Sequence, residues 1–482
     1  MAGVDAAYIA AWLLPALVGG GLWIAARGPL RAPADIAAAV GGGWMIGVLI
    51  SAGCARFAAY DDTAHAFAQA WPWCVAIGIG GWIGAIARLR GHSHGLFARP
   101  APTRAVLRAG WWLLLAWIFV RLAFLASEAS LRPVFPWDAW SAWAVKPKTW
   151  FLLGHAEPYV SMLDWLANPQ LALRTAASWG YPELLAWVEL WFASAAGAWI
   201  EPLVDVAWCG ALAAFALAAY GYWRALGLAS WLALALVYVL VSLPLIDAHV
   251  ALAGYADLWL ALTLGLATLA WVRWIVDGER GQLALAACLA LCLPAIKLEG
   301  AVWLATFGAV VAIGFLPRRW RWPTIGGIVL IAIVAVIAGA FGPVQVSWNR
   351  IEIPSLGTFA LAWHGVGGAM VSSLFTLPNW HLLWYAVPVL LVLRRRRFGS
   401  DRAARLLGLM LLIDFAFLFV LFFLTTASAW AQDFTSANRL ILQLVPSVVV
   451  LAATLLRPLP EDAISAARLR TDEASARPSV PA

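Results

Sequence analysis

Charged residues are scarce in this chain. Asp, Glu, Lys and Arg make up 12% of its 482 residues, about half the share found in soluble globular domains, while 63% of the residues are hydrophobic. The five cysteines lie in or beside apolar stretches and lack metal-ligand spacing, so no cysteine metal site is expected. We also find no repeat of fixed period and no soluble domain of useful size.

The chain consists largely of long apolar runs. Runs near twenty residues recur from end to end, which is the length that crosses about 30 Å of hydrocarbon at 1.5 Å per residue. The net charge of +7 does not indicate nucleic-acid binding, because Arg and Lys sit mostly in short runs between apolar segments. The sequence therefore predicts an all-α, polytopic transmembrane helical bundle.

The apolar runs predict about thirteen spans. The first run has no basic stretch before it, so we expect a retained helix rather than a cleaved signal. The predicted spans lie near 7–26, 35–53, 70–87, 109–126, 181–200, 203–222, 229–246, 255–274, 282–296, 300–316, 324–342, 380–393 and 405–426, with a last one at 440–456 that makes thirteen or fourteen.

The arginines predict how these spans are oriented. Basic loops should be cytoplasmic, and they begin at Arg27, Arg88, Arg273, Arg318 and Arg394. The loops expected on the outer face are 127–180, 247–255, 343–379 and 427–439. We expect one transmembrane domain over 1–456 and a disordered cytoplasmic tail over 457–482.

The predicted spans do not place successive loops on alternating faces of the membrane at every point, and one conflict arises. Loop 127–180 and Asp247 should both lie outside, yet two spans between them would place Arg224 on the wrong side. One of the segments 181–200 and 203–222 is therefore expected to be a half-span or to lie along the interface. The sequence does not decide which one.

An acidic residue among tryptophans stands out in loop 127–180. Asp138 lies in Trp137-Asp138-Ala139-Trp140, just after the apolar run near 109–126. A carboxylate there can act as a general base toward an incoming hydroxyl, or it can serve as a helix N-cap. We favour the base because Lys146 and Lys148 follow closely.

Tryptophans around this acid allow two interpretations. Belts at the membrane surface and core packing account for many of the 32 tryptophans of the chain. Indole faces also stack on the C–H faces of sugars, so Trp137, Trp140 and Trp143 are candidates for binding a sugar or an acceptor. We expect loop 127–180 to form short helices parallel to the membrane.

Four cations are candidates for binding a phosphate. Lys146 and Lys148 run against the usual charge bias if their loop is outside, although snorkelling lysines are the ordinary alternative. Lys297 interrupts an apolar run from 282 to 316, where mutual pairing with Glu299 in a re-entrant turn is the alternative. Arg439 lies at the outer mouth of the last span.

Other acidic residues lie at the ends of apolar spans. Asp257 and Glu299 are candidates for binding a sugar or an acceptor, as are Tyr181 and Glu183, which open the span after the long loop. Glu183 is also favourable in a first helical turn without any function. Asp247, His249 and Asp257 have ligand chemistry for a divalent cation, but their spacing does not support a metal site, and we predict neither a metal nor another cofactor.

These residues resemble the pattern of the bacterial polytopic glycosyltransferases of the GT-C fold, relatives of the protein O-mannosyltransferases and of the aminoarabinose transferase acting on lipid A. Asp138 in Trp-Asp-Ala-Trp matches the acidic residue of the first large extracytoplasmic loop. The segments Tyr181-Pro182, Gly254-Tyr255-Ala256-Asp257, Lys297-Leu298-Glu299-Gly300 and Asn438-Arg439 are similar in kind and order. The resemblance covers roughly residues 109 to 456.

Two departures from the family accompany the likeness. Many relatives carry an acidic pair where this chain has Asp138-Ala139, and many have one span before this loop where this chain has two or three. No soluble C-terminal domain is expected.

The resemblance implies an inverting glycosyltransferase of a bacterial inner membrane. The donor would be a polyprenyl-phosphate sugar, and the acceptor a glycan, lipid or protein on the periplasmic or extracellular face. Asp138 would be the general base, and Lys146, Lys148, Lys297 and Arg439 would bind the donor phosphate beside membrane lipid.

Two other classes of protein remain as alternatives. A transporter or flippase of a lipid-linked or polar solute also places charges at helix breaks, but near the midplane and usually with an internal repeat. A membrane scaffold without catalysis would use Asp138 only as a cap. Replacing Asp138 with Asn should spare a scaffold and stop an enzyme.

Overall fold

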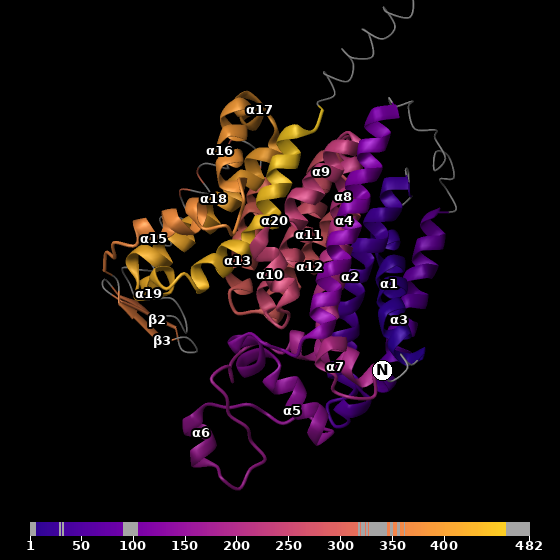
Figure 1. The fold of residues 1–482 in the computed structure, drawn as a ribbon, viewed down its shortest axis with the longest axis vertical. Coiled ribbons are helices and arrows are strands. Elements are labelled where there is room, and N and C mark those ends of the chain that lie inside the picture. The colour runs from indigo at the N-terminus through magenta and orange to yellow at the C-terminus, as the bar shows by residue number, and fades with distance from the viewer. Residues whose placement is uncertain are drawn as a thin grey trace, which may run out of the picture.

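A computed structural model describes most of the chain as a bundle of antiparallel helices (Figure 1). The described residues are 6–27, 30, 33–89, 105–316, 345–347, 350–353, 357–360 and 362–458, with isolated positions 319, 323 and 326. Apart from position 326, the predicted span near 324–342 lies outside this set, as do residues 459–482 of the predicted tail.

Eight helices in the described residues are long and apolar enough to cross a membrane. This length and composition identify a membrane-embedded helical protein. The eight are α1 (Ala6–Arg27), α2 (Pro33–Ala58), α3 (Ala66–Leu89, after the 3₁₀ turn η1, Thr63–His65), α4 (Ala105–Leu131), α8 (Glu201–Ala225), α11 (Ala256–Asp277), α18 (Arg402–Leu424) and α20 (Ser436–Leu456).

The remaining predicted spans are shorter or broken. The run near 229–246 forms α9 (Ser230–Val241) and α10 (Pro244–Ala251), which are bent by 62° where Pro244 opens the second helix. Four shorter apolar helices are α7 (Leu184–Ala195), α12 (Arg280–Ile296), α13 (Gly300–Phe315) and α16 (Leu383–Leu393). With eight qualifying helices, or nine with the bent pair, the described residues do not confirm thirteen spans.

The bundle has two distinct ends. We call the upper end in Figure 1 the arginine-rich end. There Arg402 donates a 2.6 Å hydrogen bond to the carbonyl of Gly314, and Arg457 forms an ion pair with Asp401. This end also holds Arg27, Arg88, Arg224, Arg273 and Arg280. The opposite end, which we call the loop end, carries the long loop between α4 and α7.

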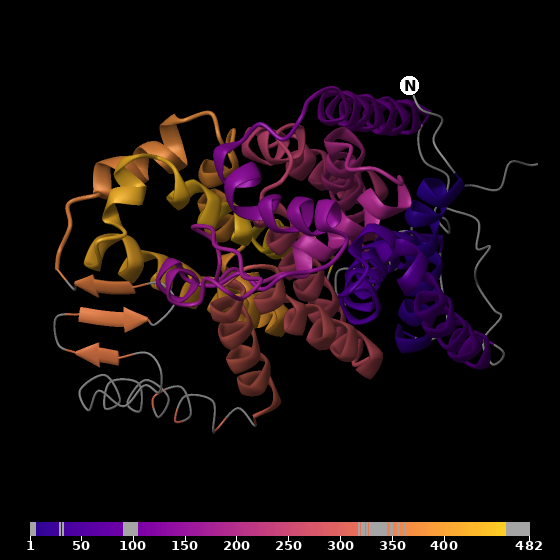
Figure 2. The same ribbon diagram turned by 90° about the horizontal axis from the view of Figure 1, so that it is seen from below.

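Short elements make up that loop end. The long loop contains a π-helical turn η2 (Ala139–Trp143), α5 (Val145–Leu153) and α6 (Met162–Ala167) and crosses the end of the bundle (Figure 2). Short helices were predicted here, and a proline inside a helix usually kinks or ends it. Pro147 lies in the first turn of α5, where the missing N–H of proline has no helical partner to lose.

A small sheet was not predicted. Strands β1 (Gln345–Ser347), β2 (Arg350–Ile353) and β3 (Gly357–Ala360) pair antiparallel in that order, beside the helices (Figure 2). The strands lie in the segment 343–379, which was expected to be an outer loop, and each is only three or four residues long. The other short helices are α15 (Gly367–Val371), the π-helical turn η3 (Ser372–Thr376), α17 (Arg395–Ser400) and α19 (Ser428–Gln432).

The helix α7 accounts for the failed alternation of sides. Near its start, Glu183 lies 3.6 Å from Arg56 at the loop end of α2. Near its last residue, the Ser194 hydroxyl accepts from the amide of Phe67, at the loop end of α3. Both ends of α7 therefore lie at the loop end, so the segment 181–200 does not cross and Arg224 reaches the arginine-rich end.

Glycines bring α1 and α2 into backbone contact. A Cβ at Gly47 would overlap the carbonyl of Pro15, and one at Gly19 would overlap the carbonyl of Gly43. Small residues at such crossings let transmembrane helices approach closely and gain packing energy. This contact fixes α2, which in turn packs against α7 and α8 beneath the long loop.

Replacing Gly47 with Ala should therefore separate α1 from α2. Overpacking of this kind typically costs about 1–3 kcal/mol, so the melting temperature of the purified protein should fall. Gly53→Ala is the matched control, because a Cβ at this position of the same helix meets nothing within 4 Å. Equal melting temperatures for the two variants would contradict the close contact.

Candidate functional site

Asp138 joins the long loop to the bundle. It directly precedes η2, but its side chain makes no capping hydrogen bond, so the interpretation as a helix cap does not hold. Its carboxylate instead pairs with Nη1 of Arg439, which is 301 residues away in sequence. The Asp138 side chain keeps 42% of its surface exposed and is accessible from solvent.

Arg439 connects Asp138 with a second, buried carboxylate. Its Nε and Nη2 lie 3.0 and 2.8 Å from Oδ2 of Asp257, in the first turn of α11. The guanidinium also lies over the ring of Tyr255, 4.3 Å from its centroid. Arg439 thus uses both edges of its fork, one for each aspartate.

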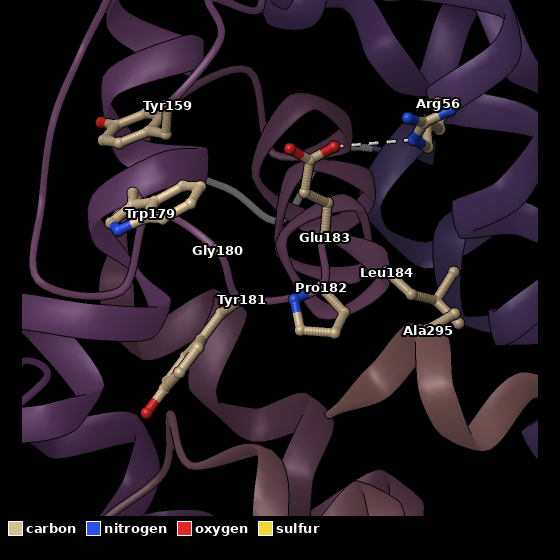
Figure 3. Close-up of a pocket in the computed structure, with 9 residues that line it drawn as sticks. All are labelled: Arg56, Tyr159, Trp179, Gly180, Tyr181, Pro182, Glu183, Leu184 and Ala295. Carbon is tan, nitrogen blue, oxygen red and sulfur yellow. Dashed lines mark ion pairs between the residues drawn. The ribbon is translucent and has the colours of Figure 1, made fainter. Parts of the chain in front are cut away.

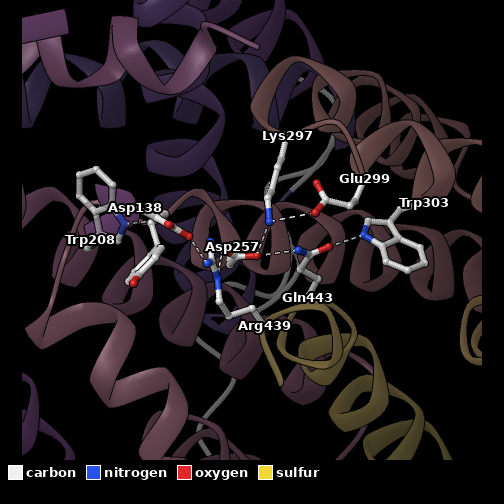
Figure 4. A network of polar contacts seen from close by, with 9 residues as sticks. Asp138, Trp208, Asp257, Lys297, Glu299, Trp303, Arg439 and Gln443 are labelled. Carbon is white, nitrogen blue, oxygen red and sulfur yellow. Dashed lines mark hydrogen bonds and ion pairs between the residues drawn. The ribbon is translucent and has the colours of Figure 1, made fainter. Parts of the chain in front are cut away.

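The other oxygen of Asp257 is equally well satisfied. Lys297 lies in the turn between α12 and α13, and its Nζ is 2.7 Å from Oδ1 of Asp257 and 3.0 Å from Glu299. Gln443 donates to the same Oδ1 at 2.7 Å and accepts from the indole of Trp303 at 2.7 Å. Figure 4 shows these side chains converging from α11, α13, α20 and the adjoining loops.

We call this cluster the Asp257 network. Its charged members are two cations and three carboxylates, and Asp257 is the one with no exposed surface. The exposed carboxylates, Asp138 and Glu299, lie on the side open to solvent, with 42% and 26% of their side chains exposed. The members are Asp138, Asp257, Lys297, Glu299, Arg439 and Gln443.

A glycine sets the position of Asp138. Gly254 has φ +106°, a conformation that disfavours side chains, and a Cβ on it would lie 2.6 Å from Cβ of Ala139. Ala139 is fully buried in this contact. A carboxylate at position 139 would therefore be buried against the backbone at 254.

Lys146 and Lys148 are not part of this network, which corrects their predicted place beside Asp138. Lys146 is buried and donates 2.9 Å hydrogen bonds to the carbonyls of Trp179 and Tyr181. Burial lowers the pKa of Lys146, and the charge of Glu183 opposes that effect. Lys148 pairs with Glu201 at 2.7 Å. Of the four predicted cations, only Lys297 and Arg439 converge.

The predicted aromatic residues divide into exposed and buried groups. Trp137 and Trp140 pack edge to face with 70% and 46% of their surface exposed, beside Asp138. Trp143 is buried against the ring of Tyr181, at 5.0 Å between centroids, so it is not available to a sugar. Burial raises the pKa of Tyr181.

The residues considered for a divalent cation do not form a shared site. Asp247 pairs with Arg121, and the ring of His249 contacts the carbonyl of Leu245 at 2.8 Å through Nδ1. Across the described residues, no three His, Cys, Asp or Glu side chains gather in a group suited to a metal ion.

Sequence reasoning missed Gln443, a member of the network, and Trp303, whose indole donates a hydrogen bond to Gln443. Gln443 lies four residues after Arg439 on α20, so both face the same side of the helix. That spacing was a usable signal for Gln443. Trp303 carried no signal, since its polar role depends on the partner that α20 presents.

Comparisons of the chain with models of protein families, with curated proteins and with solved structures found no match.

Removing the charge of Asp257 should destabilise the fold. Asp257→Asn would leave Arg439 and Lys297 largely buried without their shared partner, a change that costs about 3–5 kcal/mol in comparable buried pairs. Asp138→Asn takes a half-exposed carboxylate from the same arginine and should cost about 1 kcal/mol or less. Thermal unfolding of both variants in one detergent measures the difference, and a reversed order would contradict the anchoring role of Asp257.

Proposed function

We propose that this protein is a membrane glycosyltransferase of GT-C type that uses a polyprenyl-phosphate sugar donor. The observation that carries the proposal is the Arg439 side chain, which holds the accessible Asp138 and the buried Asp257 at once. A general base beside phosphate-binding cations is the arrangement that such a transfer requires.

The donor phosphate would exchange partners within the Asp257 network. Asp257 is fully buried and keeps Arg439 and Lys297 in place, whereas Asp138 and Glu299 are exposed enough to move away. A phosphate entering from the solvent side would accept hydrogen bonds from Nη1 of Arg439 and from one N–H of the Lys297 ammonium group. Asp138 would then be released from its ion pair and become free to act as a base.

The transfer itself would be a single displacement with inversion. The acceptor oxygen attacks the anomeric carbon while its proton passes to Asp138. The bond between that carbon and the phosphate oxygen breaks, and the electron pair leaves with polyprenyl phosphate. Arg439 and Lys297 stabilise the negative charge that grows on this leaving group.

The position of the network favours surface chemistry over transport. The charged groups gather where α11, α12 and α20 reach the loop end, next to the loop that carries Asp138 (Figures 1 and 4). By the charge rule, the arginine-rich end faces the cytoplasm. The site would then face the periplasm or the exterior of a bacterial inner membrane, where a glycan, lipid or protein acceptor is accessible.

Asp138→Asn should separate donor binding from turnover. The amide removes the base, so kcat should fall by about 100-fold or more. It also removes the carboxylate that competes for Arg439, so the KM for the donor should stay equal or fall. Transfer assays with a polyprenyl-phosphate sugar measure both quantities, with Asp61→Asn as an exposed control at the loop end. An unchanged kcat in a folded variant would eliminate Asp138 as the base.

Arg439→Lys should instead weaken donor binding. Lysine keeps the charge but lacks the fork that reaches two partners, so the KM for the donor should rise by about tenfold or more. Arg132→Lys is the control, since Arg132 lies outside the network and pairs with Glu128 near the end of α4. An Arg439→Lys variant with wild-type KM and kcat would show that this guanidinium does not bind the phosphate.

A further inference from the structure

A cavity lies at the loop end, near the Asp257 network. Its volume is about 430 Å³, within the range of pockets that hold small molecules. Trp179 and Tyr159 lie on one side, Arg56 on the other, and Glu183 projects between them (Figure 3). The cavity thus combines aromatic side chains with an acid and a base.

The carboxylate of Glu183 is only loosely held. Its ion pairs with Arg56 and Lys146 measure 3.6 and 4.0 Å, longer than the roughly 3.2 Å limit of a good hydrogen bond. Both oxygens therefore retain the capacity to accept hydrogen bonds from a ligand. Two adjacent hydroxyl groups match the two oxygens of one carboxylate.

Hydrogen bonds from a buried lysine hold the wall of the cavity in place. Lys146 is buried beneath it and holds the turn Trp179-Gly180-Tyr181 by two 2.9 Å hydrogen bonds to its carbonyls. Its ammonium group also lies 5.6 Å from the centroid of the Tyr159 ring. This lysine thus contacts all three aromatic residues of the lining, Trp179 and Tyr181 through their backbone and Tyr159 through its ring.

The cavity adjoins the Asp257 network. Ala295, in its lining, lies two residues before Lys297. Tyr181 also belongs to the lining, although its ring points away from Glu183 (Figure 3) and packs against Trp143. The lining therefore reaches the segment that leads into Lys297, a member of the Asp257 network.

We propose that this cavity binds a neutral saccharide unit of the acceptor. A sugar ring would rest its C–H face on Trp179 or Tyr159 and donate two neighbouring hydroxyls to Glu183, with Arg56 donating to a ring or hydroxyl oxygen. The proposal rests on the proposed glycosyltransferase function, because it assigns the class of acceptor. A glycan is thereby favoured over a protein or a simple lipid.

Direct binding to the full-length protein in nanodiscs tests this assignment. The probes are cellobiose, maltose and N,N′-diacetylchitobiose, with glucose 6-phosphate as an anionic probe, and saturation-transfer NMR titrations give the affinities. We expect at least one neutral disaccharide to bind. Glu183→Gln and Trp179→Ala should each weaken that binding by about tenfold or more, since each loses a charged acceptor or a stacking face.

Two further variants make the test specific. Trp165→Ala is the match for Trp179→Ala, because Trp165 is equally exposed in the same loop but does not line the cavity. It should bind the disaccharide as the wild type does. Suppose that disaccharide binding depends on Glu183 and Trp179 while Asp138→Asn transfers the sugar at the normal rate. The catalytic role of Asp138 would then be contradicted, and saccharide binding in this cavity would be supported.

Three results would overturn the inference. The first is that no neutral disaccharide binds. The second is that Glu183→Gln and Trp179→Ala, verified as folded by thermal unfolding, bind as well as the wild type. The third is that only glucose 6-phosphate binds and Arg56→Gln abolishes it, which would make the cavity an anion site.

Discussion

The burial of the Asp257 carboxylate is the constraint on which the site depends. A charge with no exposed surface is tolerable only when cations and hydrogen bonds surround it. Arg439, Lys297 and Gln443 meet that need from α20 and from the turn after α12. Because these partners reach one carboxylate, three separate segments of the chain are fixed at the loop end.

That constraint also brings the long loop to the bundle. Arg439 has one edge left after contacting Asp257, and Asp138 occupies it. The contact of Ala139 with Gly254 holds the backbone beside this pair. Arg439 is held by a buried carboxylate on one side and an accessible carboxylate on the other, so it can exchange the accessible partner. The proposed release of Asp138 by a phosphate depends on this exchange.

The sequence predicted much of this arrangement and missed what depends on distant partners. Apolar length predicted the long helices, but α7 is as apolar as a span, so only its contacts at both ends show that it does not cross. Asp138, Lys297 and Arg439 were singled out because charge is costly at membrane ends. Lys148 met the same criterion, but it forms an ion pair with Glu201, which lies 53 residues away in sequence.

Cleavage of the donor is the most direct test of the central claim, that the Asp257 network supports glycosyl transfer. Proteoliposomes of the full chain would receive a polyprenyl-phosphate sugar labelled in both the sugar and the lipid, together with a glycan acceptor. The account predicts that the two labels separate, giving free polyprenyl phosphate and a labelled glycan. Movement of the intact donor between leaflets, with both labels still joined, would contradict it and indicate a flippase.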